Sequence, residues 1–141
     1  MHTFERKINY YETDKMGVVH HSNYIRFFEE ARCDFLERSG LPYDMLENNG
    51  IMSPVLGVSC KYKYHVTFGD DIEIHASITD FSGVKFTVSY KLYNKNTGVL
   101  CAFGETNHCF TNSDLKPINM KKHHNEIYNK FMSLVENKSG L

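Results

Sequence analysis

Hydrophobic residues recur at helical spacing in one long segment, from Asn23 to Ser39. Within this segment the apolar residues follow one another at steps of three and four positions: Tyr24, Phe27, Phe28, Ala31, Phe35 and Leu36. That spacing places them on one face of an α-helix. Ser22 or Asn23 is expected to cap its start, and Gly40 with Pro42 marks its end. Because the apolar face is wide and aromatic, we expect other elements to enclose this helix.

Much of the remaining chain alternates between apolar and polar residues, which is typical of strands in a sheet covered on one face. The sequence predicts a first strand over residues 2–11 and four more over residues 58–68, 72–78, 84–92 and 99–111. Turns rich in Gly, Asn and Asp separate the last four strands, so we expect these strands to form a meander. A short helix is expected around Tyr43–Glu47. After Pro117 we expect an amphipathic helix whose apolar face consists of Ile127, Phe131, Leu134 and Val135.

This order of elements predicts an α+β fold, in which an antiparallel sheet of about five strands curls around one long central helix. The chain has 141 residues, and we expect a single domain over residues 1–141. A domain of this size buries roughly 70% of its unfolded surface, which is enough for a real core.

The composition narrows the function classes. A formal net charge of −1 does not suggest nucleic acid as a partner, because nucleic-acid binding needs a basic face. We find no N-terminal signal pattern and no apolar run near 18 residues, so we expect a cytoplasmic protein with no membrane span. The glycosylation sequon Asn137-Lys138-Ser139 is therefore interpreted as chance.

Four cysteines are present, without a C-x-x-C pair. Cys101 and Cys109 share one predicted strand and lie about 26 Å apart along it. A disulfide needs Cα atoms within about 7 Å, so these two cannot bridge within one chain. We expect Cys33, Cys60, Cys101 and Cys109 to be reduced thiols.

Candidate chemistry gathers just before the long helix, where Asp14 and Gly17 precede the start by a few residues. A helix N-terminus offers unpaired N–H groups and a partial positive charge, which favour a carboxylate or a developing oxyanion. Gly17 lets the loop turn tightly and lets a substrate approach the backbone. A carboxylate beside an oxyanion site suits acyl transfer. The alternative interpretation makes Asp14 a capping or turn residue.

The stretch YYETDKMGVVHHSNY, from Tyr10 to Tyr24, strongly resembles the signature of hotdog-fold acyl-CoA thioesterases. The most similar branch is the 4-hydroxybenzoyl-CoA thioesterase type, including the Tol-Pal-associated acyl-CoA thioesterases. The resemblance covers the element order from the first strand to Thr111. It implies hydrolysis of acyl-CoA thioesters without a cofactor. It also implies a homo-oligomer, a dimer or a dimer of dimers, and the exposed edge of a single five-stranded sheet independently favours pairing.

The resemblance also implies roles for individual residues. Asp14 falls on the catalytic carboxylate, and His21 on its accompanying histidine and oxyanion N–H. Tyr10 falls on an active-site tyrosine, and we expect it to share Asp14's side of an extended strand. Gly17 and His20 fall on the substrate-binding stretch. The benzoyl-specific enzymes carry an aromatic residue where this chain has His20, which does not favour an aryl substrate. Whether Asp14 attacks the thioester or acts as a general base stays open, because an ordinary carboxylate pKa near 4 makes a weak base.

Other candidate residues give weaker indications of function. Lys61 and Lys63 lie on the polar side of a predicted strand and could contact the phosphates of coenzyme A. The histidine pairs His20-His21 and His123-His124 lack the spacing of metal ligands, so no metal is expected. A hotdog dehydratase would need a histidine in a proline-rich loop, which we do not find. A non-catalytic acyl-CoA sensor on the same fold is the alternative function.

Overall fold

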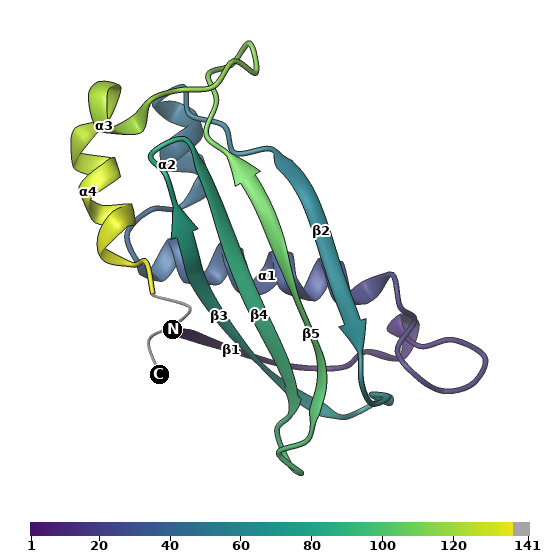
Figure 1. The fold of residues 1–141 in the computed structure, drawn as a ribbon. Helices are drawn as coiled ribbons and strands as arrows, with labels where there is room; N and C mark the ends of the chain where they lie inside the picture. The colour runs from purple at the N-terminus through teal and green to yellow at the C-terminus, as the bar shows by residue number, and fades with distance from the viewer. Residues whose placement is uncertain (137–141) are drawn as a thin grey trace.

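The computed structural model describes residues 1–136, which form one antiparallel sheet wrapped around a long helix (Figure 1). The strands are β1 (His2–Lys7), β2 (Val55–Tyr62), β3 (Asp71–Phe81), β4 (Lys85–Asn94) and β5 (Leu100–Cys109). The helical elements are the 3-10 turn η1 (Tyr10–Glu12), α1 (Asn23–Arg38), α2 (Tyr43–Asn48), α3 (Met120–His123) and α4 (Asn125–Ser133). The predicted α+β class, with five strands around one central helix, is confirmed. The sequon at Asn137 lies outside the described residues.

Helix α1 buries the whole apolar stripe that its spacing predicts. At its centre Phe28 stacks on Tyr90 of β4, with ring centroids 4.5 Å apart. Burying one such aromatic side chain contributes about 2–3 kcal/mol, so this stripe is a major reason why the sheet closes over the helix. The expected side-chain cap does not form, because the Ser22 hydroxyl instead hydrogen-bonds to Nδ1 of His20, 2.8 Å away. The helix ends at Arg38, and the expected Gly40 follows its C-cap residue Ser39 with a φ of +79°, which suits glycine.

The strand order is β1-β3-β4-β5-β2, with every neighbouring pair antiparallel. Strands β3, β4 and β5 form the expected meander. The prediction of a meander is wrong for β2, which pairs with β5 at the far edge instead of with β3. Gly104 of β5 permits this pairing, because a Cβ there would lie 2.0 Å from the backbone oxygen of Ser59.

Two predicted strands are shorter than expected. The first ends at Lys7, because Asn9 and Glu12 form a capping box that closes η1. The second begins at Val55 and ends at Tyr62. Beyond Tyr62 the backbone turns toward the segment before α1, where the N–H of Val19 donates to the carbonyl of Val66 at 2.7 Å. A long-range contact therefore ends β2 before residue 68.

Strand β2 also departs from the expected burial. The apolar faces of β3 and β4 are buried as predicted, but apolar side chains of β2 are between 45% and 57% exposed: Val55, Leu56, Val58 and Tyr62. Figure 1 shows β2 as the outermost strand, beside β5, and within residues 1–136 no strand pairs with its outer edge. An exposed apolar edge strand favours pairing with another chain.

The segment after Pro117 folds as two short helices instead of the single predicted one. Phe131 of α4 packs among Phe81, Phe86 and Phe110, with ring centroids 4.7–5.2 Å apart. The predicted apolar face is therefore partly confirmed, by buried Phe131 and half-buried Ile127. Leu134 and Val135 lie just beyond the end of α4.

A chain of buried polar side chains crosses the interface between α1 and the sheet. Arg32 donates from Nε to the hydroxyl of Tyr43 (2.9 Å) and from Nη1 to that of Tyr90 (3.0 Å). The Tyr90 hydroxyl lies 2.7 Å from Oγ1 of Thr106, which lies 2.7 Å from Nε2 of His108. Burial, together with the positive charge of Arg32, lowers the pKa of His108 from 6.5 to about 4. His108 is therefore neutral inside the fold at pH 7.

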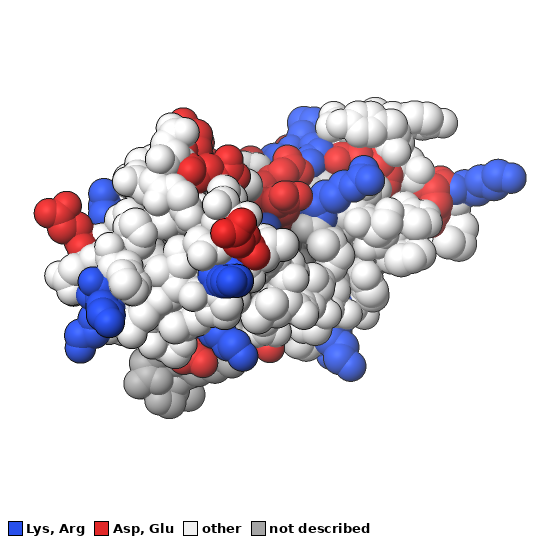
Figure 2. All heavy atoms as spheres, turned by 90° about the horizontal axis from the view of Figure 1, so that it is seen from above, with Lys and Arg blue, Asp and Glu red and all other residues white. Residues whose placement is uncertain are grey.

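All four cysteines are free, as expected, and Cys101 and Cys109 lie on the same strand, β5. Between residues 1 and 136, no helix combines the length and apolar character needed to cross a membrane. On the face of the molecule shown in Figure 2, lysine and arginine side chains are interspersed with aspartate and glutamate.

Candidate active site

The segment between η1 and α1 folds back on itself as a tight loop. Thr13 pairs with Val19 in an antiparallel bridge, and the N–H of Asp14 donates to the carbonyl of Val18 at 2.8 Å. At the tip, Gly17 adopts a φ of +80°, which suits glycine and explains its place in the motif. The Oδ1 atom of Asp14 accepts the N–H of Met16 at 2.8 Å. The carboxylate is thereby held by its own turn.

Asp14 and His21 open on the same cavity, of about 350 Å³. Its walls come from the loop, from the first turn of α1 and from the segment at the end of β2. The lining residues are Asp14, Met16, Val18, Val19, His21, Tyr24, Tyr62, Lys63, Tyr64 and His65. Residues distant in sequence therefore meet beside the start of the long helix.

The backbone just before α1 uses the N–H groups on both sides of His21 in hydrogen bonds. The N–H of His20 donates to the carbonyl of Glu12 (2.9 Å), and the N–H of Ser22 donates to Nδ1 of His20 (3.2 Å). Among residues 1–136, the N–H of His21 has no acceptor. It lies immediately before α1, where the helix dipole adds a partial positive charge. An unpaired N–H donor at this position can stabilise negative charge that develops on a substrate oxygen.

Two tyrosines close the cavity beside this donor. The Tyr62 hydroxyl donates to the carbonyl of His21 at 3.3 Å, and the rings of Tyr62 and Tyr24 pack edge to face with centroids 5.0 Å apart. Burial raises the pKa of both hydroxyls. At neutral pH both side chains are therefore uncharged hydroxyl donors.

The structure brings some of the predicted residues together and separates others. Asp14, His21 and Lys63 line one cavity. Tyr10 lies in η1 instead of an extended strand, is 76% exposed and packs edge-on against Phe68. The prediction that Tyr10 shares Asp14's side of a strand is therefore wrong, because the 3-10 turn redirects its side chain. The ring of His20 stacks on that of His21 with centroids 4.2 Å apart.

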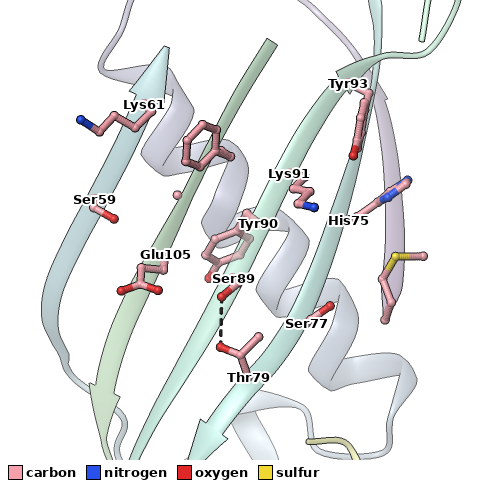
Figure 3. A pocket seen from close by; sticks show the side chains of 13 residues that line it. Ser59, Lys61, His75, Ser77, Thr79, Ser89, Tyr90, Lys91, Tyr93 and Glu105 are labelled. Atoms are coloured by element: carbon pink, nitrogen blue, oxygen red, sulfur yellow. Dashed lines mark hydrogen bonds between the residues drawn. The ribbon is translucent and has the colours of Figure 1, made fainter. Parts of the chain in front are cut away.

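Lys61 and Lys63 line different cavities, although residues two apart in one strand would share a face. The Nζ of Lys63 nevertheless lies over the ring of Phe103, 5.7 Å from its centroid, and Phe103 borders the same cavity as Lys61. Lys63 follows the end of β2 and lines the Asp14 cavity. Lys61 lies within β2 and borders a second cavity of about 650 Å³ on the sheet face turned away from α1 (Figure 3). Figure 3 shows serine, threonine and tyrosine side chains of β3 and β4 across this second cavity. The early end of β2 accounts for the separation.

Sequence reasoning misses Tyr62 and Tyr64, because both fit the apolar side of a predicted strand. Their exposure at the free edge, 51% and 55%, is what makes them available to the cavity. Sequence reasoning also assigns no role to Glu12, although it lies within the Tyr10–Tyr24 motif. Its acidic side chain is only 6% exposed. Within the described part of the chain, no group of three His, Cys, Asp or Glu side chains could hold a metal ion.

Comparison with known proteins places the chain in a family. Residues 8–131 match the family described as "Thioesterase-like superfamily". YneP of Bacillus subtilis, provisionally named an acyl-CoA thioesterase, is 33% identical over 119 residues, which cover 84% of this chain and 86% of YneP. The acyl-CoA thioester hydrolase YbgC of Escherichia coli O157:H7 is 26% identical over 94 residues, 67% of this chain and 70% of YbgC.

Solved structures agree with this assignment. The hypothetical protein TT1821 of Thermus thermophilus superposes with a TM-score of 0.87 at 33% identity, covering 95% of this chain and 99% of that one. The DHNA-CoA thioesterase of Staphylococcus aureus superposes with a TM-score of 0.88 at 28% identity, covering 94% and 89%. With the family match spanning most of its length, this chain belongs to the thioesterase-like superfamily and has its hotdog fold.

Proposed function

We propose that this protein hydrolyses acyl-CoA thioesters to a free acid and coenzyme A. One observation carries the proposal: Asp14 and His21, whose backbone N–H is unpaired within residues 1–136, line the same cavity ahead of the α1 N-terminus. Thioester hydrolysis needs a group that attacks or activates water, and a donor for the carbonyl oxygen as it gains charge. The relatives named as acyl-CoA thioesterases support the substrate class.

In the proposed reaction the thioester carbonyl oxygen accepts the N–H of His21. Asp14 then either attacks the carbonyl carbon, expelling the thiolate and leaving a mixed anhydride that water hydrolyses, or removes a proton from an attacking water. One oxyanion donor contributes roughly 3–4 kcal/mol in comparable acyl-transfer sites. Lys63 is the proposed contact for the phosphates of coenzyme A, since it lines the cavity and Lys61 faces the other side of the sheet.

The test is release of free thiol from a panel of acyl-CoAs that differ in chain length and in aryl character. Turnover of at least one member supports the enzyme. Binding without turnover across the panel would contradict hydrolysis and identify an acyl-CoA sensor. Running the reaction with hydroxylamine separates the two roles of Asp14, because an aspartyl anhydride yields a hydroxamate on Asp14 and general-base catalysis does not.

We further propose that the protein is a homodimer at least, paired through β2. The edge of β2 is free and carries exposed Leu56 and Val58, so a second copy would complete its hydrogen bonds and cover its apolar side chains. We expect light scattering to give at least about twice the chain mass of 16.4 kDa.

Replacing Val58 with lysine should shift the mass toward that of the single chain, because the new charges would face each other across the edge. Met132→Lys is the matched control, since Met132 is an exposed apolar residue of α4, on the other side of the molecule from β2 in Figure 1. A fully active species of 16.4 kDa would contradict pairing.

A further inference from the structure

Glu12 is a buried acid at the end of η1, just before the loop that carries Asp14, and hydrolysis as proposed gives it no chemical step. Its side chain is 6% exposed. Oε1 of Glu12 accepts a hydrogen bond from Nη2 of Arg6 and another from the N–H of Asn9, 2.8 Å away. Buried carboxylates in folded proteins are ordinarily paired and hydrogen-bonded in this way. The fold therefore fixes this residue firmly.

Arg6 fastens Glu12 to the long helix. Its Nη1 donates to Oε1 of Glu30 on α1, and its guanidinium lies over the ring of Phe27, 4.5 Å from the centroid. One side chain thus joins β1, η1 and α1. Because Arg6 is anchored on the helix, Glu12 is held at a set position relative to the helix N-terminus.

The backbone carbonyl of Glu12 holds the residues on both sides of the proposed oxyanion donor, the N–H of His21. The same oxygen accepts the N–H of His20 at 2.9 Å and Nδ2 of Asn23 at 2.8 Å. His20 and Asn23 flank the His21–Ser22 pair. Both ends of the short segment that contains the His21 N–H are therefore hydrogen-bonded to the carbonyl oxygen of Glu12. A displacement of Glu12 moves that donor relative to Asp14, and small displacements of catalytic groups are costly.

We propose that Glu12, held by Arg6, is a positioning residue that aims the His21 N–H at the substrate oxygen. The inference rests on the proposed function for the identity of the reaction. It predicts an effect on the transition state and little effect on substrate binding, because Glu12 does not line the cavity. Glu12→Gln keeps the size of the side chain and removes the charge that Arg6 holds.

For Glu12→Gln we expect kcat to fall about tenfold or more, short of the 10²–10³ lost with a complete oxyanion donor. KM should change by less than about twofold. Asn23→Ala removes the second bond to the same carbonyl and should show the same split between kcat and KM. Glu5→Gln is the matched control, since Glu5 is an exposed acid of β1 that pairs with Lys95, and it should behave as wild type.

A second measurement does not depend on turnover. Amide hydrogen exchange of His20 should become at least about tenfold faster in Glu12→Gln and stay unchanged in Glu5→Gln, because its acceptor is the Glu12 carbonyl. This readout also decides the inference if Glu12→Gln is too unstable for kinetics, because Asn23→Ala can be measured in the same way.

The outcomes separate the two proposals. If wild type hydrolyses no acyl-CoA, the proposed function fails, and unchanged exchange of His20 would then overturn the positioning role as well. If wild type is active but Glu12→Gln and Asn23→Ala keep kcat within about twofold, or if only KM rises, the positioning role is wrong and the proposed function stands. Equal losses in Glu5→Gln would show a general effect of charge and would also overturn it.

Discussion

Replacing Asp14 with asparagine is expected to lower kcat by about a hundredfold or more while the protein stays folded. The amide has the size of the carboxylate and keeps an oxygen that can accept the N–H of Met16, so the loop retains its turn. It cannot attack a thioester carbon effectively or take a proton from water. Steady-state thiol release with the best acyl-CoA of the panel measures the loss, and circular dichroism confirms the fold.

The matched control is Asp114→Asn, an exposed aspartate in the loop after β5. Its kcat should equal that of wild type. Near-normal turnover by a folded Asp14→Asn protein would remove Asp14 from catalysis and leave the alternative interpretation, in which Asp14 only shapes the turn.

The free energy of unfolding is expected to fall by about 3 kcal/mol as the pH drops from 6.5 to 4, through His108 alone. Burial and Arg32 lower the pKa of His108 in the folded state to about 4. Between these pH values the unfolded chain binds a proton at His108 and the folded chain does not. Protons therefore favour unfolding, and the stability present above pH 6.5 is lost progressively toward pH 4.

Urea unfolding of wild type and His108→Gln across this pH range measures the effect. Glutamine can still hydrogen-bond to Thr106 but does not titrate, so the variant should be less stable at pH 7 and show a shallower loss toward pH 4. The difference between the two proteins isolates His108 from other titrating groups. His123→Gln, at an exposed histidine, is the control. Parallel curves for wild type and His108→Gln would contradict a buried, neutral histidine.

The elements that could be predicted from sequence are those whose own residue spacing shows which face is buried. Helix α1 shows its apolar face at helical spacing, and β3 and β4 alternate cleanly because one face of each meets the helix. The β2 segment alternates as well, yet its apolar side chains remain exposed and its end is set by the Val18–Val19 segment. Alternation shows that a strand forms, but its partner depends on contacts far away in sequence.

The same limit applies to the site. Asp14 and His21 belong to one contiguous motif, so their proximity could be expected from sequence and occurs in the structure. Tyr62 joins them across some forty positions because β2 runs to the edge beside the loop. Lys61 and Lys63 could not be separated from sequence, since the strand end between them follows from tertiary contacts.

The missing side chain at Gly104 offers a way to alter the Asp14 cavity from a position outside it. The backbone of Ser59 occupies the space where a side chain at position 104 would begin, so any larger residue there must displace the main chain of β2. Neither Gly104 nor Ser59 lines the Asp14 cavity. Gly104 faces Cys60 in the register, and Tyr62 lies two residues further along β2. A larger residue at position 104 is therefore expected to shift β2, and Tyr62 with it, relative to the Asp14 loop. A search for altered acyl-length preference can therefore begin at position 104, behind the wall, without changing any group that meets the substrate.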